Sequence, residues 1–205
     1  MISRPALALA LVATLFWHAA APSSQAQDAA APSYQQMVDR AINYLATKGQ
    51  NAEGAFTPAT GPAITALVTT GILRQGRSPE DPVVAKALKY IETFVRDDGG
   101  IYAEGSRNKN YETCIAIVCL EAANRSGRYD MQLKKADAFI KSNQWGNDGQ
   151  TPVGDVKYGG AGYGRTGDRP DLSNTSFLMD ALKATGNGAD SEAVQRALVF
   201  VSRCQ

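Results

Sequence analysis

The fold is decided by the stretch Ala87-Leu-Lys-Tyr90-Ile91-Glu-Thr-Phe-Val95-Arg-Asp-Asp98-Gly-Gly100-Ile-Tyr102. Its apolar residues recur every three or four positions as far as Val95, which predicts an amphipathic helix. The run of aspartate and glycine that ends at Gly100 favours a turn, and the aromatic Tyr102 follows it. The stretch therefore predicts a helix, a glycine turn and an aromatic residue that closes the turn.

The same pattern occurs in other parts of the chain. Ala41-Ile-Asn-Tyr44-Leu45 precedes Gly54-Ala-Phe56 with the same spacing, 13 positions from alanine to glycine and 15 to the aromatic. Ala136-Asp-Ala-Phe139-Ile140 precedes a glycine, again after 13 positions, and Ala197-Leu-Val-Phe200-Val201 begins a fourth copy. Matches in register predict an array of repeats. The expected turn glycines are Gly54, Gly100, Gly149 and Gly162.

Each repeat is expected to hold two helices. Ser33 with Gln36 resembles a capping box, and Asp81 before Pro82 is typical of a helix start. The first helices are predicted at about 33–48, 82–95, 130–143 and 192–203, and the second helices at about 62–74, 111–124 and 173–185. Thr60, Thr113 and Thr175 put the second helices in register, each six residues before the small residue Ala66, Cys119 or Ala181.

This arrangement predicts an all-α fold of stacked helical hairpins, about three and a half repeats long. No segment of useful length alternates strictly between polar and apolar residues, which argues against a β architecture. Nearly every residue of the second helix at 111–124 is apolar or small, so we expect that helix to be buried on more than one side.

The N-terminal region is expected to be separate from this fold. Residues 1–26 combine Arg4, an apolar run and a small-x-small ending, which predicts an export signal and a periplasmic or secreted protein. An uncleaved anchor is the alternative. Residues 27–33 are predicted to be a disordered leader, and residues 34–205 to be the repeat domain.

The C-terminus gives a further expectation. Val194, Ala197, Leu198 and Val201 form a helical stripe without a following helix to cover it. We therefore expect a repeat domain that is incomplete at its C-terminus, and self-association through that last helix is a natural consequence.

Charge and cysteine content limit the partners. Arg4 is the only charged residue in 1–26, so 20 basic and 20 acidic residues remain, a balance without a nucleic-acid footprint. The apolar run is too short for a stable membrane span. Cys114 and Cys119 lie about 8–9 Å apart on one predicted helix, too far to bridge, so no intrachain disulfide is expected with Cys204 as the third cysteine.

The repeat resembles that of the squalene–hopene cyclases and of the protein prenyltransferase β subunits. The cyclase repeat has an aromatic and an aliphatic residue, then Gln, then Gly-x-Trp. Phe139-Ile140 is followed by Gln144 and Gly149, and Phe200-Val201 is followed by Gln205. Val95 stands at the glutamine place of the second repeat and Gly49 at that of the first, with Gln50 one position late. The resemblance implies an α/α toroid, in which second helices form an inner ring around a cavity that holds an isoprenoid chain.

The catalytic groups of those enzymes have no counterpart here. The acid motif Asp-x-Asp-Asp is absent, because Asp97-Asp98 and Asp168-Arg-Pro-Asp171 have different spacings. His18 is the only histidine and lies in the predicted signal, so neither the family's Asp–Cys–His zinc site nor a Ser–His or Cys–His nucleophile is expected. We predict no catalytic residue, no metal and no cofactor.

The long loop of the third repeat is the remaining candidate for a site. Gly162, Gly164 and Gly167 match G-x-G-x-x-G as a string, but no strand precedes them, so close loop packing is the better interpretation. Tyr158, Tyr163 and Arg165 of this loop are candidates for lining a ligand cavity, together with Tyr102 and Tyr111 of the second repeat.

Three functions follow from these patterns. The first is an exported, non-catalytic repeat protein that binds a hydrophobic (isoprenoid) ligand or a protein partner. The second is part of an isoprenoid cyclase or prenyltransferase whose catalytic residues lie in other sequence. The third is a carbohydrate-active enzyme, which needs facing carboxylates that the sequence does not pair.

Overall fold

The computed structural model describes residues 31–164 and 169–205. Within these segments the chain is helical and its only β-type pairs are two isolated bridges, Val95 with Ile101 and Ala161 with Asp171. The helices belong to one compact unit, Ser33–Gln205. They are α1 (Tyr34–Tyr44), α2 (Ala63–Arg74), α3 (Pro82–Glu92), α4 (Lys109–Ala122), α5 (Asp130–Asn143), α6 (Leu172–Ala184) and α7 (Glu192–Arg203), with a π-helical turn at Leu45–Gly49 and a 3₁₀ turn at Pro58–Thr60.

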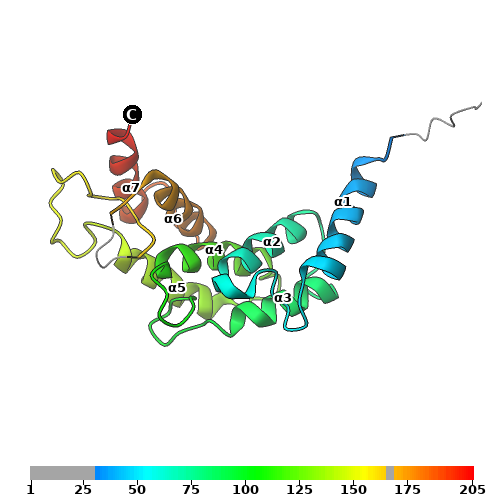
Figure 1. Ribbon diagram of the computed structural model, residues 1–205. Helices are drawn as coiled ribbons and strands as arrows, with labels where there is room; N and C mark the ends of the chain where they lie inside the picture. Colours follow the sequence, from blue (N-terminus) through cyan, green and yellow to red (C-terminus); the bar gives the residue numbers. More distant parts are fainter. Residues whose placement is uncertain (1–30, 165–168) are drawn as a thin grey trace, which may run out of the picture. The chain divides into compact units, whose positions relative to one another are not determined.

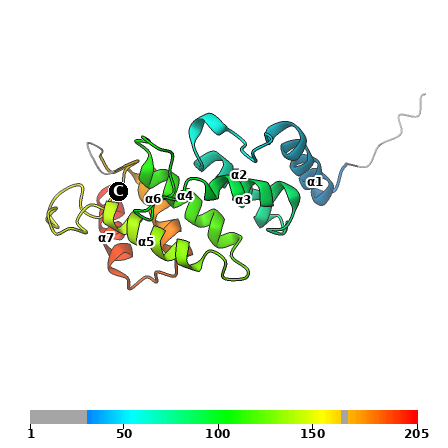
Figure 2. The same cartoon turned by 90° about the horizontal axis from the view of Figure 1, so that it is seen from below.

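The helices form two rows (Figures 1 and 2). The second helices of the repeats pack side by side, α2 against α4 and α4 against α6, and form the inner row. The first helices α3, α5 and α7 form the outer row, each packed against the inner helix before it. The middle helix α4 is covered on several sides, and residues as different as Ile117, Cys119 and Glu112 are all buried in it. The predicted all-α arrangement and the burial of this helix are confirmed.

Most helix ends agree with the sequence signals. Ser33 and Gln36 form both hydrogen bonds of a capping box, and the Asp81 side chain accepts a hydrogen bond from the Val83 N–H at 3.1 Å. The predicted end of the helix at Val95 is wrong. Helix α3 ends at Glu92, and Val95 lies in the bridge to Ile101 because the chain has already turned back toward Tyr102.

The contact between one repeat and the next, which we call a joint, depends on a glycine. Joint one places Gly54 on α3, joint two places Gly99 on α5, and joint three places Gly159 on α7. All three glycines have a positive φ, at +97°, +90° and +86°, where only glycine is unstrained. A Cβ atom on these glycines would lie 2.2 Å from the Lys86 carbonyl oxygen, 2.6 Å from that of Lys135 and 1.7 Å from that of Arg196.

Of the four predicted turn glycines, only Gly54 forms a joint, because Gly99 and Gly159 form the other two. Gly100 lies in its turn but without a positive φ; a Cβ there would instead meet the Tyr102 ring at 2.4 Å. Gly149 has a positive φ but open space around it, so it holds no joint. Gly162 only offers its carbonyl to the Asn110 side chain, at 3.0 Å. Spacing misled the prediction because the turns differ in length.

In each joint the glycine packs against the outer helix beside the repeated alanine. Ala87, Ala136 and Ala197 directly follow the carbonyls that the joint glycines approach, and all three are fully buried. Ala197 was expected in an open stripe and belongs to joint three instead, whereas Leu198 beside it is 40% exposed. Ala41 on α1 is exposed. A larger side chain at the buried alanines would hold the glycine turn away from the helix.

A glutamine side chain forms hydrogen bonds across joints one and three. The Gln144 side-chain nitrogen donates to the Gly159 and Ala193 carbonyl oxygens at 2.9 and 2.8 Å. Gln50 makes the matching bonds to Gly54 and Val83 at 3.1 and 2.8 Å. Gln50 is one position late in the sequence because the turn before it is π-helical, and the wider turn takes up the extra residue.

A threonine marks the true register of the inner helices. Its hydroxyl accepts the N–H of the second residue after the joint glycine, through Thr65, Thr113 and Thr175 at 3.1, 3.0 and 3.0 Å. The predicted register used Thr60, which is wrong. Thr60 lies in the exposed 3₁₀ turn before α2, so the first repeat is shifted by five residues.

The predicted export signal at residues 1–26 and nearly all of the predicted leader at 27–33 lie outside the described residues. None of the described helices has the length and apolar character needed to span a bilayer.

Candidate ligand-binding site

The inner row turns one face away from the outer helices, and the threonine register shows that this inner face is built in layers. Two positions after the threonine, the three helices present Leu67, Ile115 and Phe177. Five positions after it they present Thr70, Val118 and Asp180. Residues separated by three positions share a helix face, so the two layers are adjacent. The inner face thus has an apolar layer next to a mixed one.

A groove of about 260 Å³ lies on this face. Helix α4 forms its floor, and α2 and α6 form its walls. Apolar side chains from all three helices line it. One of them, Leu67, is 41% exposed although its side chain has no polar atom. The charged residues of the groove are one cation from the last turn of α2 and one carboxylate from α6. The residues that line it are Leu67, Thr70, Gly71, Arg74, Cys114, Ile115, Val118, Phe177 and Asp180.

An aromatic cluster extends the groove toward the start of α4. The Tyr111 ring lies 5.3 Å from Phe177 and 5.6 Å from Tyr163, measured between ring centroids. The loop that carries Tyr163 is fixed there because its carbonyl accepts the N–H groups of Asn110 and Tyr111, at 2.8 and 3.1 Å. Burial raises the pKa of Tyr111, so its hydroxyl stays protonated at neutral pH. Two of the predicted cavity residues, Tyr111 and Tyr163, therefore come together beside the groove.

The other predicted cavity residues have different roles. Tyr102 is buried in joint two, where it donates to Asp98 at 2.5 Å and stacks on Phe139 at 5.6 Å. Burial, followed by the bond to Asp98, raises the pKa of Tyr102 to about 12. Tyr158 packs over Gly146 in the long loop and touches no residue of the groove in the contacts described. Arg165 lies outside the described residues.

Sequence reasoning missed the residues of the groove itself. Leu67, Ile115 and Phe177 occupy the same place in three repeats, and a correct register of the second helices would have revealed them. The incorrect pairing of Thr60 with Thr113 and Thr175 concealed that periodicity, because it moved the first repeat by more than one helical turn.

Glu112 is the buried carboxylate closest to the aromatic cluster. It accepts a hydrogen bond from the Ala103 N–H at 2.7 Å and another from the Ser106 hydroxyl. Burial raises the pKa of Glu112, although both hydrogen bonds act in the opposite direction. Because both carboxylate oxygens hold the loop at 103–106, this residue has a structural role.

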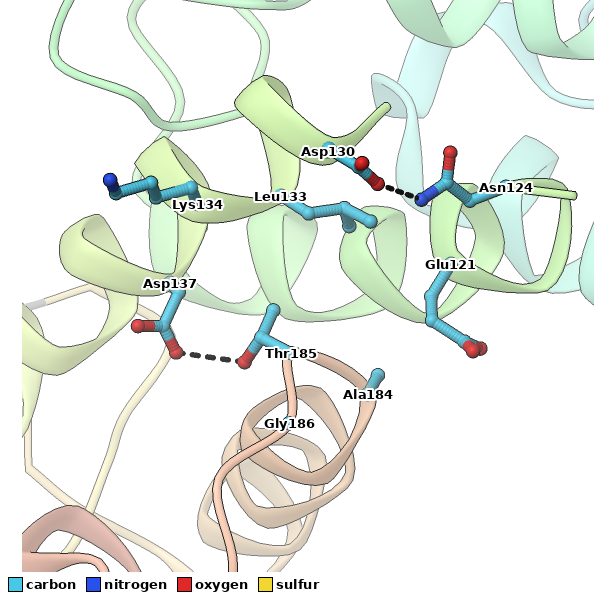
Figure 3. Close-up of a pocket in the computed structure, with 9 residues that line it drawn as sticks. All are labelled: Glu121, Asn124, Asp130, Leu133, Lys134, Asp137, Ala184, Thr185 and Gly186. Atoms are coloured by element: carbon cyan, nitrogen blue, oxygen red, sulfur yellow. Dashed lines mark hydrogen bonds between the residues drawn. The ribbon is translucent and has the colours of Figure 1, made fainter. Parts of the chain in front are cut away.

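A second, larger pocket of about 480 Å³ lies at the C-terminal ends of α4 and α6 (Figure 3). Three carboxylates line it, and two of them are already engaged. Asp130 accepts from Asn124 at 2.7 Å, and Asp137 accepts from Thr185 and Asn187 at 2.8 Å each and pairs with Lys141 at 2.6 Å. These contacts join α5 to the ends of the inner helices. Two of the three carboxylates of this polar pocket therefore already stabilise helix packing.

A third groove, of about 350 Å³, lies between α1 and α2, and its lining is mainly apolar. It is bounded by Tyr34 and Gln75, which hydrogen bond to each other at 2.8 Å. This groove has no charged residue among those that line it, unlike the groove on the inner face.

No group of three metal-ligating side chains occurs within the described part of the chain. Cys114 and Cys119 are buried free thiols, and Cys204 is an exposed one. Burial raises the pKa of the Cys119 thiol to about 12, which makes it a poor nucleophile and a poor metal ligand at neutral pH.

Comparisons with known proteins agree with this geometry. No curated protein and no solved structure matches the chain. The family model of the squalene-hopene cyclase C-terminal domain matches residues 53–205, which is more than half of the chain and includes α2 to α7. The two rows of helices are the arrangement of an α/α toroid, with the inner row on the side of the groove. The chain therefore belongs to the squalene-hopene cyclase C-terminal domain family.

Proposed function

We propose that this protein binds an apolar ligand in the groove of the inner face and catalyses no reaction on it. The observation that carries the proposal is the repeated apolar layer of the groove, in which Leu67 is 41% exposed, Phe177 is half-buried and the buried Ile115 lies between them as part of the floor. Apolar surface that stays open to water costs free energy, and a ligand that covers it recovers about 25 cal/mol for each Å². Concave, mainly apolar sites with few polar groups are typical of small-molecule binding.

The size and shape of the groove favour a chain-like ligand. At about 260 Å³ the groove alone is slightly smaller than the usual site of a drug-sized molecule, which begins at about 300 Å³. The aromatic cluster of Tyr111, Tyr163 and Phe177 continues the apolar surface beyond it. A linear hydrocarbon or isoprenoid chain fits such an elongated surface better than a compact ring system does.

The lack of catalysis rests on the sequence. Alkene protonation requires an unusually strong acid, and the Asp-x-Asp-Asp motif that supplies it in the family is absent. Asp180 is the one carboxylate that lines the groove, and it is exposed to water. Membership of the cyclase family favours one alternative, in which this chain is part of a cyclase or prenyltransferase whose catalytic residues lie in other sequence.

Binding of a neutral apolar probe tests the proposal. We expect the fluorescence of N-phenyl-1-naphthylamine to rise on addition of the protein and to saturate. The variant Val118→Trp fills the groove from its floor and should weaken probe binding by about tenfold or more. Unchanged probe affinity in a folded Val118→Trp protein would place the ligand elsewhere.

A matched control separates the two apolar grooves. Val38 lines the groove between α1 and α2, and like Val118 it is half-buried on a helix. The variant Val38→Trp should leave the probe affinity unchanged. Circular dichroism and thermal unfolding confirm that both variants fold. Incubation of the protein with squalene, followed by product analysis, tests the enzymatic alternative.

A further inference from the structure

The groove of the inner face carries two opposite charges that have no partner among the described residues. Arg74 and Asp180 both line the groove, and neither forms an ion pair or a hydrogen bond with another described side chain. Some other charged residues of the same helical unit are paired, such as Arg77 with Asp39 at 2.9 Å and Lys141 with Asp137 at 2.6 Å.

The two charges are held apart by the helix between them. Arg74 comes from the last turn of α2 and Asp180 from α6, and α4 packs between these helices. Ile115 and Val118 of α4 form the apolar floor between the two walls. An apolar strip with a cation on one side and a carboxylate on the other is therefore open to a ligand from above.

We propose that the ligand of this groove is a zwitterionic amphiphile, with an apolar chain on the inner face, an anionic group at Arg74 and a cationic group at Asp180. This inference rests on the proposed function and adds the chemistry of the ligand's polar part. A singly charged head group is attracted by one wall and repelled by the other, whereas a zwitterion satisfies both. A neutral head group gains from neither charge.

The size of the preference follows from the exposure of both residues. Arg74 and Asp180 are exposed, so water screens the attraction between each of them and the oppositely charged group of the ligand. We expect removal of one matching charge to weaken binding by about two- to fivefold. The preference should decrease as salt is added, while the affinity of the apolar chain does not.

Four amphiphiles with the same dodecyl chain test the inference, each below its micelle-forming concentration. They are dodecylphosphocholine (zwitterionic), dodecyl maltoside (neutral), dodecanoate (anionic) and dodecyltrimethylammonium (cationic). Calorimetry or displacement of the fluorescent probe gives each affinity. We expect the zwitterion to bind most tightly to the unmodified protein at low salt.

Charge variants give the sharper result. Arg74→Gln should shift the preference to the cationic amphiphile, and Asp180→Asn should shift it to the anionic one. The double variant should lose the preference between head groups but keep its affinity for the chain. Lys89→Gln, which removes an exposed charge from the outer helix α3, is the matched control and should change nothing.

Each outcome decides between the two proposals. Equal binding of all four amphiphiles, or a wild-type preference for a singly charged one, overturns the zwitterion inference and leaves the apolar groove intact. No binding of any amphiphile overturns the proposed function and this inference together. The crossed shifts of Arg74→Gln and Asp180→Asn support both, because surface binding of detergent does not depend on these two residues.

Discussion

Joint three and joint two solve the same packing problem with different side chains. In joint three Gln144 reaches across to the Ala193 carbonyl of the next outer helix, and it is fully buried. Joint two has Val95 at the equivalent position, five residues after Tyr90 as Gln144 is five after Phe139, and among the described residues no side chain of this loop hydrogen bonds to α5. The polar contacts described for joint two lie within its own repeat, such as Arg96 to the Tyr102 carbonyl at 2.9 Å and the Ile101 N–H to Thr113 at 3.0 Å.

Joint two replaces the missing bonds with an aromatic contact. Tyr102 stacks on Phe139 of α5 at 5.6 Å, with 29° between the ring planes. This replacement leaves one polar group unsatisfied, at Gln132 of α5. Gln132 lies four residues before Ala136, as Ala193 lies four residues before Ala197 in α7. Its side-chain nitrogen is buried without a partner among the described residues. The comparison teaches that the glycine is essential to every joint, whereas the glutamine can be exchanged for packing.

The largest effect is expected from the joint glycines. Gly159→Ala places a Cβ 1.7 Å from the Arg196 carbonyl oxygen at a positive φ, and we expect a loss of about 3 kcal/mol in the free energy of unfolding. Gly99→Ala, with a Cβ at 2.6 Å, should cost about 2 kcal/mol. Urea unfolding measures both.

Gly149→Ala is the control for the backbone angle alone, because its φ is also positive but nothing lies within 4 Å of the added Cβ. It should cost about 1 kcal/mol. A Gly159→Ala protein as stable as Gly149→Ala would contradict the joint.

The next effect separates joint three from joint two. Gln144→Leu leaves the buried carbonyls of Gly159 and Ala193 without their donor and should cost about 2–3 kcal/mol. Gln50→Leu should cost less, because its bonds are only partly buried. Gln150→Leu, at an exposed position of the long loop, is the control. Equal stability of Gln144→Leu and Gln150→Leu would show that packing alone holds joint three.

A pH series tests the buried carboxylate that holds the loop after joint two. Burial raises the pKa of Glu112 in the folded protein, so its favourable contribution is complete below the ordinary carboxyl pKa of about 4.3. That contribution is lost as the pH rises through the raised folded value.

The variant Glu112→Gln is neutral at every pH. We therefore expect the free energy of unfolding of the wild type, relative to that of this variant, to fall from pH 4 to pH 7. Thermal unfolding at each pH measures the difference. A stability difference that grows over this range means that the hydrogen bonds from Ala103 and Ser106 outweigh burial.

The smallest effect is a gain. Gln132→Met keeps the length of the side chain but removes the unpartnered buried nitrogen, and we expect the protein to become more stable by up to about 1 kcal/mol. The same change at the exposed Gln150, whose side chain has no partner among the described residues, should have no effect. A clear loss of stability in Gln132→Met would mean that its side-chain nitrogen has a partner in solution.

Local structure followed from the sequence alone. Helix starts such as Ser33 and Asp81 depend on hydrogen bonds to residues within the same helical turn, and these signals gave correct boundaries. The three- and four-residue periodicity identified the all-α repeat, because burial of one helix face imposes that period wherever the helix packs. The same argument identified α4 as the most buried helix.

Only the tertiary structure decided which residues meet across repeats. A fixed spacing of 13 positions assumed turns of equal length, but a π-helical turn adds a residue before Gly54, and the long loop displaces the third joint glycine from 149 to 159. The sequence shows both insertions, as a glutamine that is one position late and as a long loop, but it does not show which glycine then meets the next repeat. The register is set instead by steric contact between a glycine and a carbonyl in another repeat.

The candidate site likewise combines residues that could be predicted from the sequence with residues that only packing brings together. Tyr111 and Tyr163 were predicted from the residue type alone and do lie together, but the layer of Leu67, Ile115 and Phe177 required the correct register of three helices. Arg74 and Asp180 are 106 positions apart in the chain and share a groove only because α2 and α6 both pack against α4. Side-chain chemistry is encoded locally, whereas proximity between distant residues arises from packing.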